Sequence, residues 1–207
     1  MLLHLHLEPP VDTILAVTVG AVLATFGGFL ATEMEATLRR KERERSAALL
    51  FGELLTALGT IIKIADQSRG HGDPFGPFTL RMLRAAQRET DAYERNRGAL
   101  YDLRDGRLRL QIHVLMVQVS LALEGVFETT AAIAAAGSNL GNDAGGSGSE
   151  AAVEQLAHDR IAAFDAAIES VGEVPSLLGK LEKLGGVSFE DVDQFSGNPY
   201  PEMANQA

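Results

Sequence analysis

The chain has no cysteine and no tryptophan among its 207 residues. The lack of cysteine excludes disulfides, thiol catalysis and cysteine-ligated zinc sites. Basic residues are scarce in the second half, because residues 110–207 carry 3 Lys/Arg against 14 Asp/Glu, a net charge of −11. Residues 33–109 carry 15 against 12, a net charge of +3. The overall charge of −10 and the absence of a recognition motif argue against nucleic-acid binding.

The familiar catalytic and ligand-binding motifs are also missing. The chain has no HExxH, no ExxH pair, no GxSxG and no P-loop sequence. These motifs would mark a zinc protease, a di-metal bundle, an α/β-hydrolase and a phosphate-binding loop. We therefore expect a protein that is not an enzyme and that holds no cofactor and no metal.

A few histidines and carboxylates stand at spacings that functional sites also use. His113 lies in an apolar stretch, where a hydrogen-bonded core histidine is the ordinary finding. The others form an HxH pair, a His-x-Asp pair and two carboxylates one helical turn apart, namely His4 with His6, His71 with Asp73, and Glu124 with Glu128. The HxH pair has no third ligand nearby, and the two carboxylates have no histidine neighbour. An enzyme that uses His113 and carboxylates remains an alternative if His113 clusters with other polar groups.

A run of 20 uncharged residues, Thr13 to Thr32, lies near the start of the chain and reads TILAVTVGAVLATFGGFLAT. As a helix it reaches about 30 Å, the thickness of a bilayer's hydrocarbon core. Its threonines can bond carbonyls one turn earlier, which satisfies their hydroxyls within the helix. The run predicts a transmembrane helix, which we call the anchor segment. Two alternatives are a buried soluble helix and a cleaved signal peptide, although residues 1–12 lack the Lys or Arg of a signal peptide.

The charges on either side of the anchor segment predict its orientation. Glu8 and Asp12 precede it, and a basic cluster follows it. Because Lys and Arg favour the cytoplasmic side, we expect a single-pass protein of the cell (inner) membrane, with its N-terminus outside and its C-terminal domain in the cytoplasm. The basic cluster also lies where anionic headgroups are, and it consists of Arg39, Arg40, Lys41, Arg43 and Arg45.

Small residues recur at every fourth position of the anchor segment. In a helix they share one face, and small side chains on one face let a second backbone approach closely. This pattern predicts a homo-oligomer, in the simplest case a parallel dimer in the bilayer. The small-residue stripe consists of Ala16, Gly20, Ala24, Gly28 and Thr32.

The remainder of the chain alternates helical apolar patterns with helix breakers. No breaker separates the anchor segment from Asp66, so the transmembrane helix is expected to continue into a cytoplasmic antiparallel helical bundle, an all-α fold. The expected parts are a short extracytoplasmic tail at 1–12, the transmembrane helix at 13–32, juxtamembrane and core helices at 33–136, a flexible Gly/Ser linker at 137–149, the last bundle helix at 150–184 and a mostly disordered acidic tail at 185–207.

The segment from Arg107 to Ala136 is the most apolar after the anchor segment. A row at alternating steps of four and three favours a core-facing helix, and consists of Leu108, Ile112, Leu115, Val119, Ala122 and Val126. A strand is an alternative for its Val-rich part. A second membrane span is another, although polar residues such as Gln111 and Gln118 argue against it.

These features favour an interaction or scaffold protein bound to the lipid bilayer. We expect it to self-associate through the anchor segment and to hold a protein partner whose identity the sequence does not give. The alternative is a ligand-responsive sensor or small-molecule binding module, with an apolar ligand held between the helices of the bundle.

Overall fold

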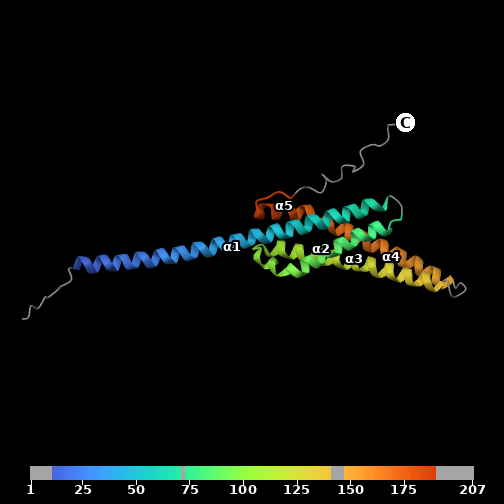
Figure 1. Cartoon of the computed structure of the whole chain (residues 1–207), viewed down its shortest axis with the longest axis horizontal. Coiled ribbons are helices and arrows are strands. Elements are labelled where there is room, and N and C mark those ends of the chain that lie inside the picture. The colour runs from blue at the N-terminus through green and yellow to red at the C-terminus, as the bar shows by residue number, and fades with distance from the viewer. Residues whose placement is uncertain (1–10, 71–72, 141–146, 190–207) are drawn as a thin grey trace, which may run out of the picture. The chain divides into compact units, whose positions relative to one another are not determined.

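The computed structural model describes residues 11–70, 73–140 and 147–189 (Figure 1). Every element in these residues is helical, which confirms the all-α class. The chain divides into two compact units, one ending at Arg43 and the other beginning at Glu44. In chain order the elements are α1 (Val11–Arg69), α2 (Pro77–Asn96), the 3-10 helix η1 (Arg97–Asp102), α3 (Gly106–Leu140), α4 (Ser147–Val171) and α5 (Val174–Gly185).

The first unit contributes the N-terminal part of α1. Its described side chains are exposed, including large apolar ones such as Leu23, Phe26 and Phe29. The threonines bond carbonyls one turn earlier, as expected: Thr25 Oγ1 donates to the carbonyl of Ala21 at 2.8 Å, and the hydroxyl of Thr32 bonds in the same way. The hydroxyls therefore place no unsatisfied donor on this apolar surface.

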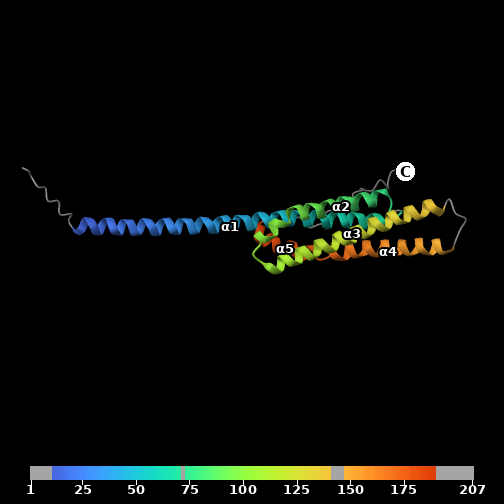
Figure 2. The same cartoon turned by 90° about the horizontal axis from the view of Figure 1, so that it is seen from below.

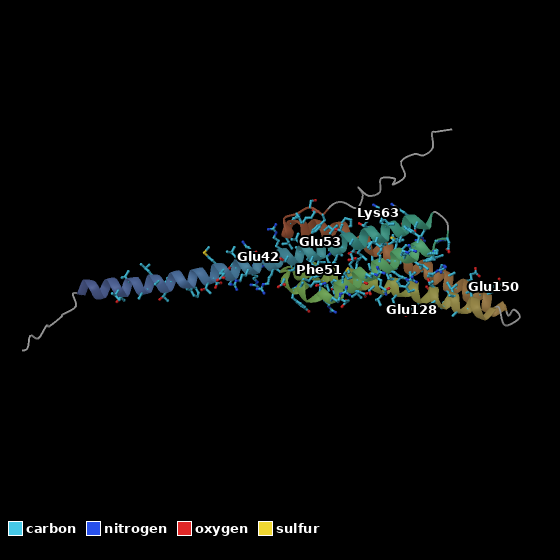
Figure 3. The ribbon with its side chains drawn as sticks, viewed as in Figure 1. Glu42, Phe51, Glu53, Lys63, Glu128 and Glu150 are labelled. Carbon is cyan, nitrogen blue, oxygen red and sulfur yellow. The ribbon has the colours of Figure 1, made fainter. Side chains whose placement is uncertain are left out.

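The second unit is a bundle of helices around one apolar core (Figures 1 and 2). The C-terminal half of α1 lies beside α2, α4 and α5 and turns Phe51, Leu55, Leu58 and Ile62 inward. Figure 3 labels Phe51 within the bundle and Glu128 on its surface. Each fully buried side chain of this size contributes roughly 1.5–3 kcal/mol.

Helix α3 packs against α4, α2 and α5. The row of α3 residues from Leu108 to Val126 that was expected to face the core is buried. The strand alternative for this segment is wrong, because only a helix brings positions spaced by four and three residues onto one buried face. Gly125 lets α4 approach closely, since a Cβ atom added there would lie 3.3 Å from the side chain of Ala163.

Short polar contacts define the helix ends. Asp105 begins α3 by accepting hydrogen bonds from the backbone N–H groups of Arg107 at 2.8 Å and Leu108 at 3.2 Å. Gly186 ends α5 with a φ of 66°, a left-handed conformation that glycine adopts without steric cost. Helix α2 ends at Asn96, and the chain then tightens into η1.

The helices extend into the ranges that were expected to be linker and tail. Helix α3 runs to Leu140 and α4 begins at Ser147, so helix occupies both ends of the linker expected at 137–149, and residues 141–146 lie outside the described part. At the start of the tail, the backbone N–H of Phe189 donates to Glu182 at 2.9 Å, and its ring lies directly over Gly52 of α1. Residues 190–207 of the tail expected at 185–207, and residues 1–10 of the tail expected at 1–12, lie outside the described residues.

Candidate functional site

The small-residue stripe lies on α1 with open space in front of it. A Cβ atom added at Gly20 or Gly28 would meet nothing within 4 Å, and Ala24 and Thr32 are exposed. Ala16 is part of the same helix, but its side chain lies outside the described set. A face without projecting side chains can accept a second helix at short range.

The basic cluster is exposed and divided between the two units. Arg39, Arg40, Lys41 and Arg43 belong to the first unit, where Arg39 forms an ion pair with Glu35 one turn earlier. Arg45 instead belongs to the bundle, because its Nε donates to the carbonyl of Gly185 at 2.9 Å and so satisfies an orphan carbonyl at the end of α5. This fifth residue therefore has a structural contact that the sequence did not indicate.

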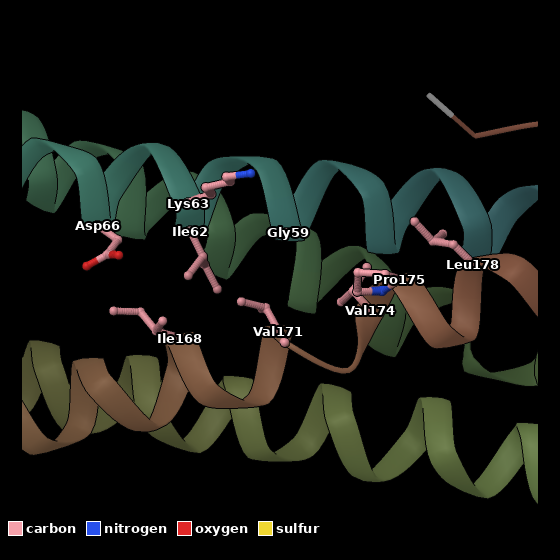
Figure 4. A pocket seen from close by; sticks show the side chains of 10 residues that line it. Gly59, Ile62, Lys63, Asp66, Ile168, Val171, Val174, Pro175 and Leu178 are labelled. Atoms are coloured by element: carbon pink, nitrogen blue, oxygen red, sulfur yellow. The ribbon is translucent and has the colours of Figure 1, made fainter. Parts of the chain in front are cut away.

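A cavity of about 210 Å³ lies between α1, α4 and α5 (Figure 4). Ile168 and Val171 of α4 face Ile62 of α1 across it. Lys63 and Asp66 of α1 are also among the lining residues. Cavities of about 150 Å³ lined by aliphatic side chains admit a molecule the size of benzene. The cavity is therefore large enough for a small apolar ligand with one polar group.

A second pocket, of about 230 Å³, lies where η1 meets α2 and α3. Tyr93 Oη forms a hydrogen bond of 2.7 Å with Nδ1 of His113, and the two rings are stacked with centroids 6.2 Å apart. The remaining lining is Arg97, Leu100, Tyr101, Arg109 and Leu110. We call this the tyrosine–histidine pocket. His113 is therefore hydrogen-bonded, as expected, but it is half-buried at the edge of this pocket rather than fully enclosed in the core.

The electrostatics of this pocket keep Tyr93 protonated. Burial raises the pKa of Tyr93 above its ordinary value of 10.0, Arg97 opposes this shift, and Glu94 and Tyr101 add to it. A neutral phenol can donate or accept a hydrogen bond, as in its contact with Nδ1 of His113, but it is a poor nucleophile. The pocket thus has groups that can hold an anion, but no carboxylate lines it to act as a base.

The other candidate site residues from the sequence are not brought together in the described part of the structure. Glu124 and Glu128 are exposed on the outer side of α3. His4, His6 and His71 lie outside the described residues. Within the described ranges no group of three or more His, Asp or Glu side chains is placed to hold a metal ion.

Neither pocket was predictable from the sequence, because both arise from tertiary packing. Tyr93 and His113 are 20 residues apart and meet only because η1 turns the chain back on itself. The heptad spacing of the apolar residues indicates which face is buried, but it does not show where two packed faces leave a gap.

Two helices are long and apolar enough to cross a membrane, in the ranges Val17–Arg69 and Gly106–Gly137. Such helices are also found in the cores of soluble proteins, and a signal sequence passes the same criterion. No protein-family model, no curated protein sequence and no solved structure matches the chain.

Proposed function

We propose that the chain is a single-pass membrane protein whose cytoplasmic helical bundle works as an interaction scaffold. The observation that carries the proposal is the exposure of large apolar side chains along the first unit of α1: Val17, Leu23, Phe26, Phe29 and Met34 are each between 64% and 67% exposed. Contiguous apolar surface of this kind marks a membrane or partner contact. A lipid environment covers a helix on every side, and these residues lie on several sides of α1.

The second candidate helix, α3, is assigned to the bundle in this proposal. One of its faces supplies core residues from Leu108 to Val126. Its other positions include the exposed charges Arg107, Glu124 and Glu128, which are costly in hydrocarbon. The basic residues Arg39 to Arg43 favour a cytoplasmic bundle and an N-terminus outside.

The attachment is tested by placing two charges on the exposed apolar surface. Each arginine near the middle of a membrane helix costs roughly 2.5–3.5 kcal/mol of insertion free energy. We expect Leu23→Arg with Phe26→Arg to move the full-length chain from the alkali-resistant membrane pellet to the soluble fraction. A matched control is Tyr101→Arg, at a bundle residue that is 76% exposed, which should leave the chain in the pellet. Retention of the double variant in the pellet would contradict the proposal.

The cavity between α1, α4 and α5 supports a second candidate function, a small-molecule binding module. Gly59 lines the cavity, and a Cβ atom there would come only into ordinary contact with Val174 at 3.6 Å. Gly59→Leu should therefore fill the cavity without destabilising α1, and Gly59→Ala is the matched control.

This candidate is measured as a thermal shift of the full-length chain with indole, an apolar ring with one donor. A ligand that binds only the folded state raises the Tm. We expect a higher Tm for the wild type and for Gly59→Ala, but not for Gly59→Leu. An equal shift in all three chains, or no shift in any, would eliminate the cavity as a binding site for this class.

A further inference from the structure

Helix α3 carries a second apolar row on the side that faces away from the bundle core. Leu110, Val114, Val117 and Leu121 are 61%, 42%, 36% and 62% exposed. Their steps of four, three and four place them on one face, opposite the buried row of the same helix. We call these four residues the outer row. Because an a/d spacing of this kind is the seam of a helix pair, the outer row has the pattern of a contact surface.

The outer row is too short to be a membrane surface. From Leu110 to Leu121 it extends about 16 Å at the helical rise of 1.5 Å per residue, roughly half of a hydrocarbon core. Charged residues continue the same spacing at both ends, Arg107 three positions before and Glu124 three positions after. Both side chains are exposed, and neither forms an ion pair within the described part of the chain.

Read from either end, this face shows the same order of apolar residues: a leucine, two valines and a leucine. The charged residues at its two ends have opposite signs, Arg107 at one end and Glu124 at the other. In an antiparallel pair centred between Leu115 and Met116, Leu110 of one copy lies opposite Leu121 of the other, and Val114 lies opposite Val117. The same register places Arg107 opposite Glu124, and the two-fold axis repeats this pairing at the other end. A parallel pair would instead place Arg107 against Arg107 and Glu124 against Glu124, which is unfavourable.

We propose that the outer row of α3 binds the outer row of a second copy of this chain in an antiparallel, two-fold symmetric pair. This symmetry makes the contact isologous, so that it closes at two copies. Four apolar side chains from each copy leave water, and two ion pairs set the register. The contact uses only bundle residues and is separate from the small-residue stripe of the anchor segment.

The absence of cysteine from the chain makes the register directly measurable. The full-length Leu110→Cys and Leu121→Cys chains, carrying different tags, are mixed in mild detergent and oxidised. Opposite positions of a helix pair lie within the reach of a disulfide. Equivalent positions, in contrast, are offset by about 16 Å, which is beyond the roughly 7 Å limit between Cα atoms. We expect a cross-link in the mixture and little in either chain alone.

Controls and charge reversals complete the test. Asp91→Cys, at an exposed position of α2, should not cross-link with Leu121→Cys. Arg107→Glu or Glu124→Arg alone should weaken association about tenfold, since two favourable ion pairs become two repulsive ones, and the double variant should restore it. Cross-linking of Leu110→Cys with itself would overturn the antiparallel register. No cross-link in the mixture, as expected if lipid or another protein covers this row, would overturn the proposal.

Discussion

At the scale of single residues, two buried or half-buried polar side chains, Tyr93 and Arg69, form contacts between helices of the bundle. Tyr93 is 1% exposed and is satisfied by His113, so its phenol is buried at little cost. Arg69 links the end of α1 to α4 through a 2.6 Å contact with Asp165 and stacks over Phe164 with 4.9 Å to the ring centroid. Both contacts join side chains of different helices, and burial of Tyr93 also raises the pKa of its phenol.

The raised pKa of Tyr93 predicts a loss of stability in alkali. In the unfolded chain this phenol ionises near pH 10, whereas in the bundle burial holds its pKa higher. Between these two values the unfolded state binds fewer protons, so stability is fully present below pH 10 and declines as the pH rises through the folded pKa. We expect the Tm of the wild type to fall above pH 10 more steeply than that of Tyr93→Phe. Parallel pH profiles would show that Tyr93 contributes nothing to this dependence.

At the scale of elements, α1 has a different role on each side of Arg43. After this residue most of its large apolar side chains are buried or half-buried in the bundle, and before it the described ones are exposed. The small-residue stripe from Gly20 to Thr32 belongs to the exposed part, and this placement favours helix association in a bilayer.

The stripe predicts that bulky residues prevent association of the anchor segments. Gly20→Leu with Gly28→Leu removes the close approach of two backbones, because a leucine side chain separates them. We expect the double variant to lose its signal in a membrane two-hybrid assay of residues 1–43 fused to reporter domains. Val22→Leu, at an exposed position off the stripe, is the control and should keep the signal. An unchanged signal in the double variant would eliminate the stripe as an interface.

The sequence predicts features that depend on local residue spacing better than features that depend on how helices dock. The core row of α3 was predictable, because a regular spacing of apolar residues reports a buried face directly. The outer row at Leu110 to Leu121 was missed because the same residue types occur on both faces of α3, so apolarity alone does not identify the core. The pairing of Tyr93 with His113 and the cavity beside Gly59 depend on how separate helices dock, which local pattern does not encode.

At the scale of the whole molecule, charge changes along the chain in a way that fits membrane attachment. Residues 33–109, which follow the anchor segment, have a net charge of +3, and residues 110–207 have −11. An anionic membrane surface attracts the first group and repels the second. This charge pattern supports the proposal that the anchor segment crosses the membrane once, with the bundle in the cytoplasm.

Accessibility of single cysteines in intact cells tests this claim most directly, since the natural chain has none. Glu8→Cys lies before the anchor segment, and Asp91→Cys lies on the exposed side of α2. With a maleimide that does not cross membranes, we expect Glu8→Cys to be labelled in intact cells and Asp91→Cys to be labelled only after the membrane is permeabilised. Labelling of Asp91→Cys in intact cells, or recovery of both chains in the soluble fraction, would contradict the account.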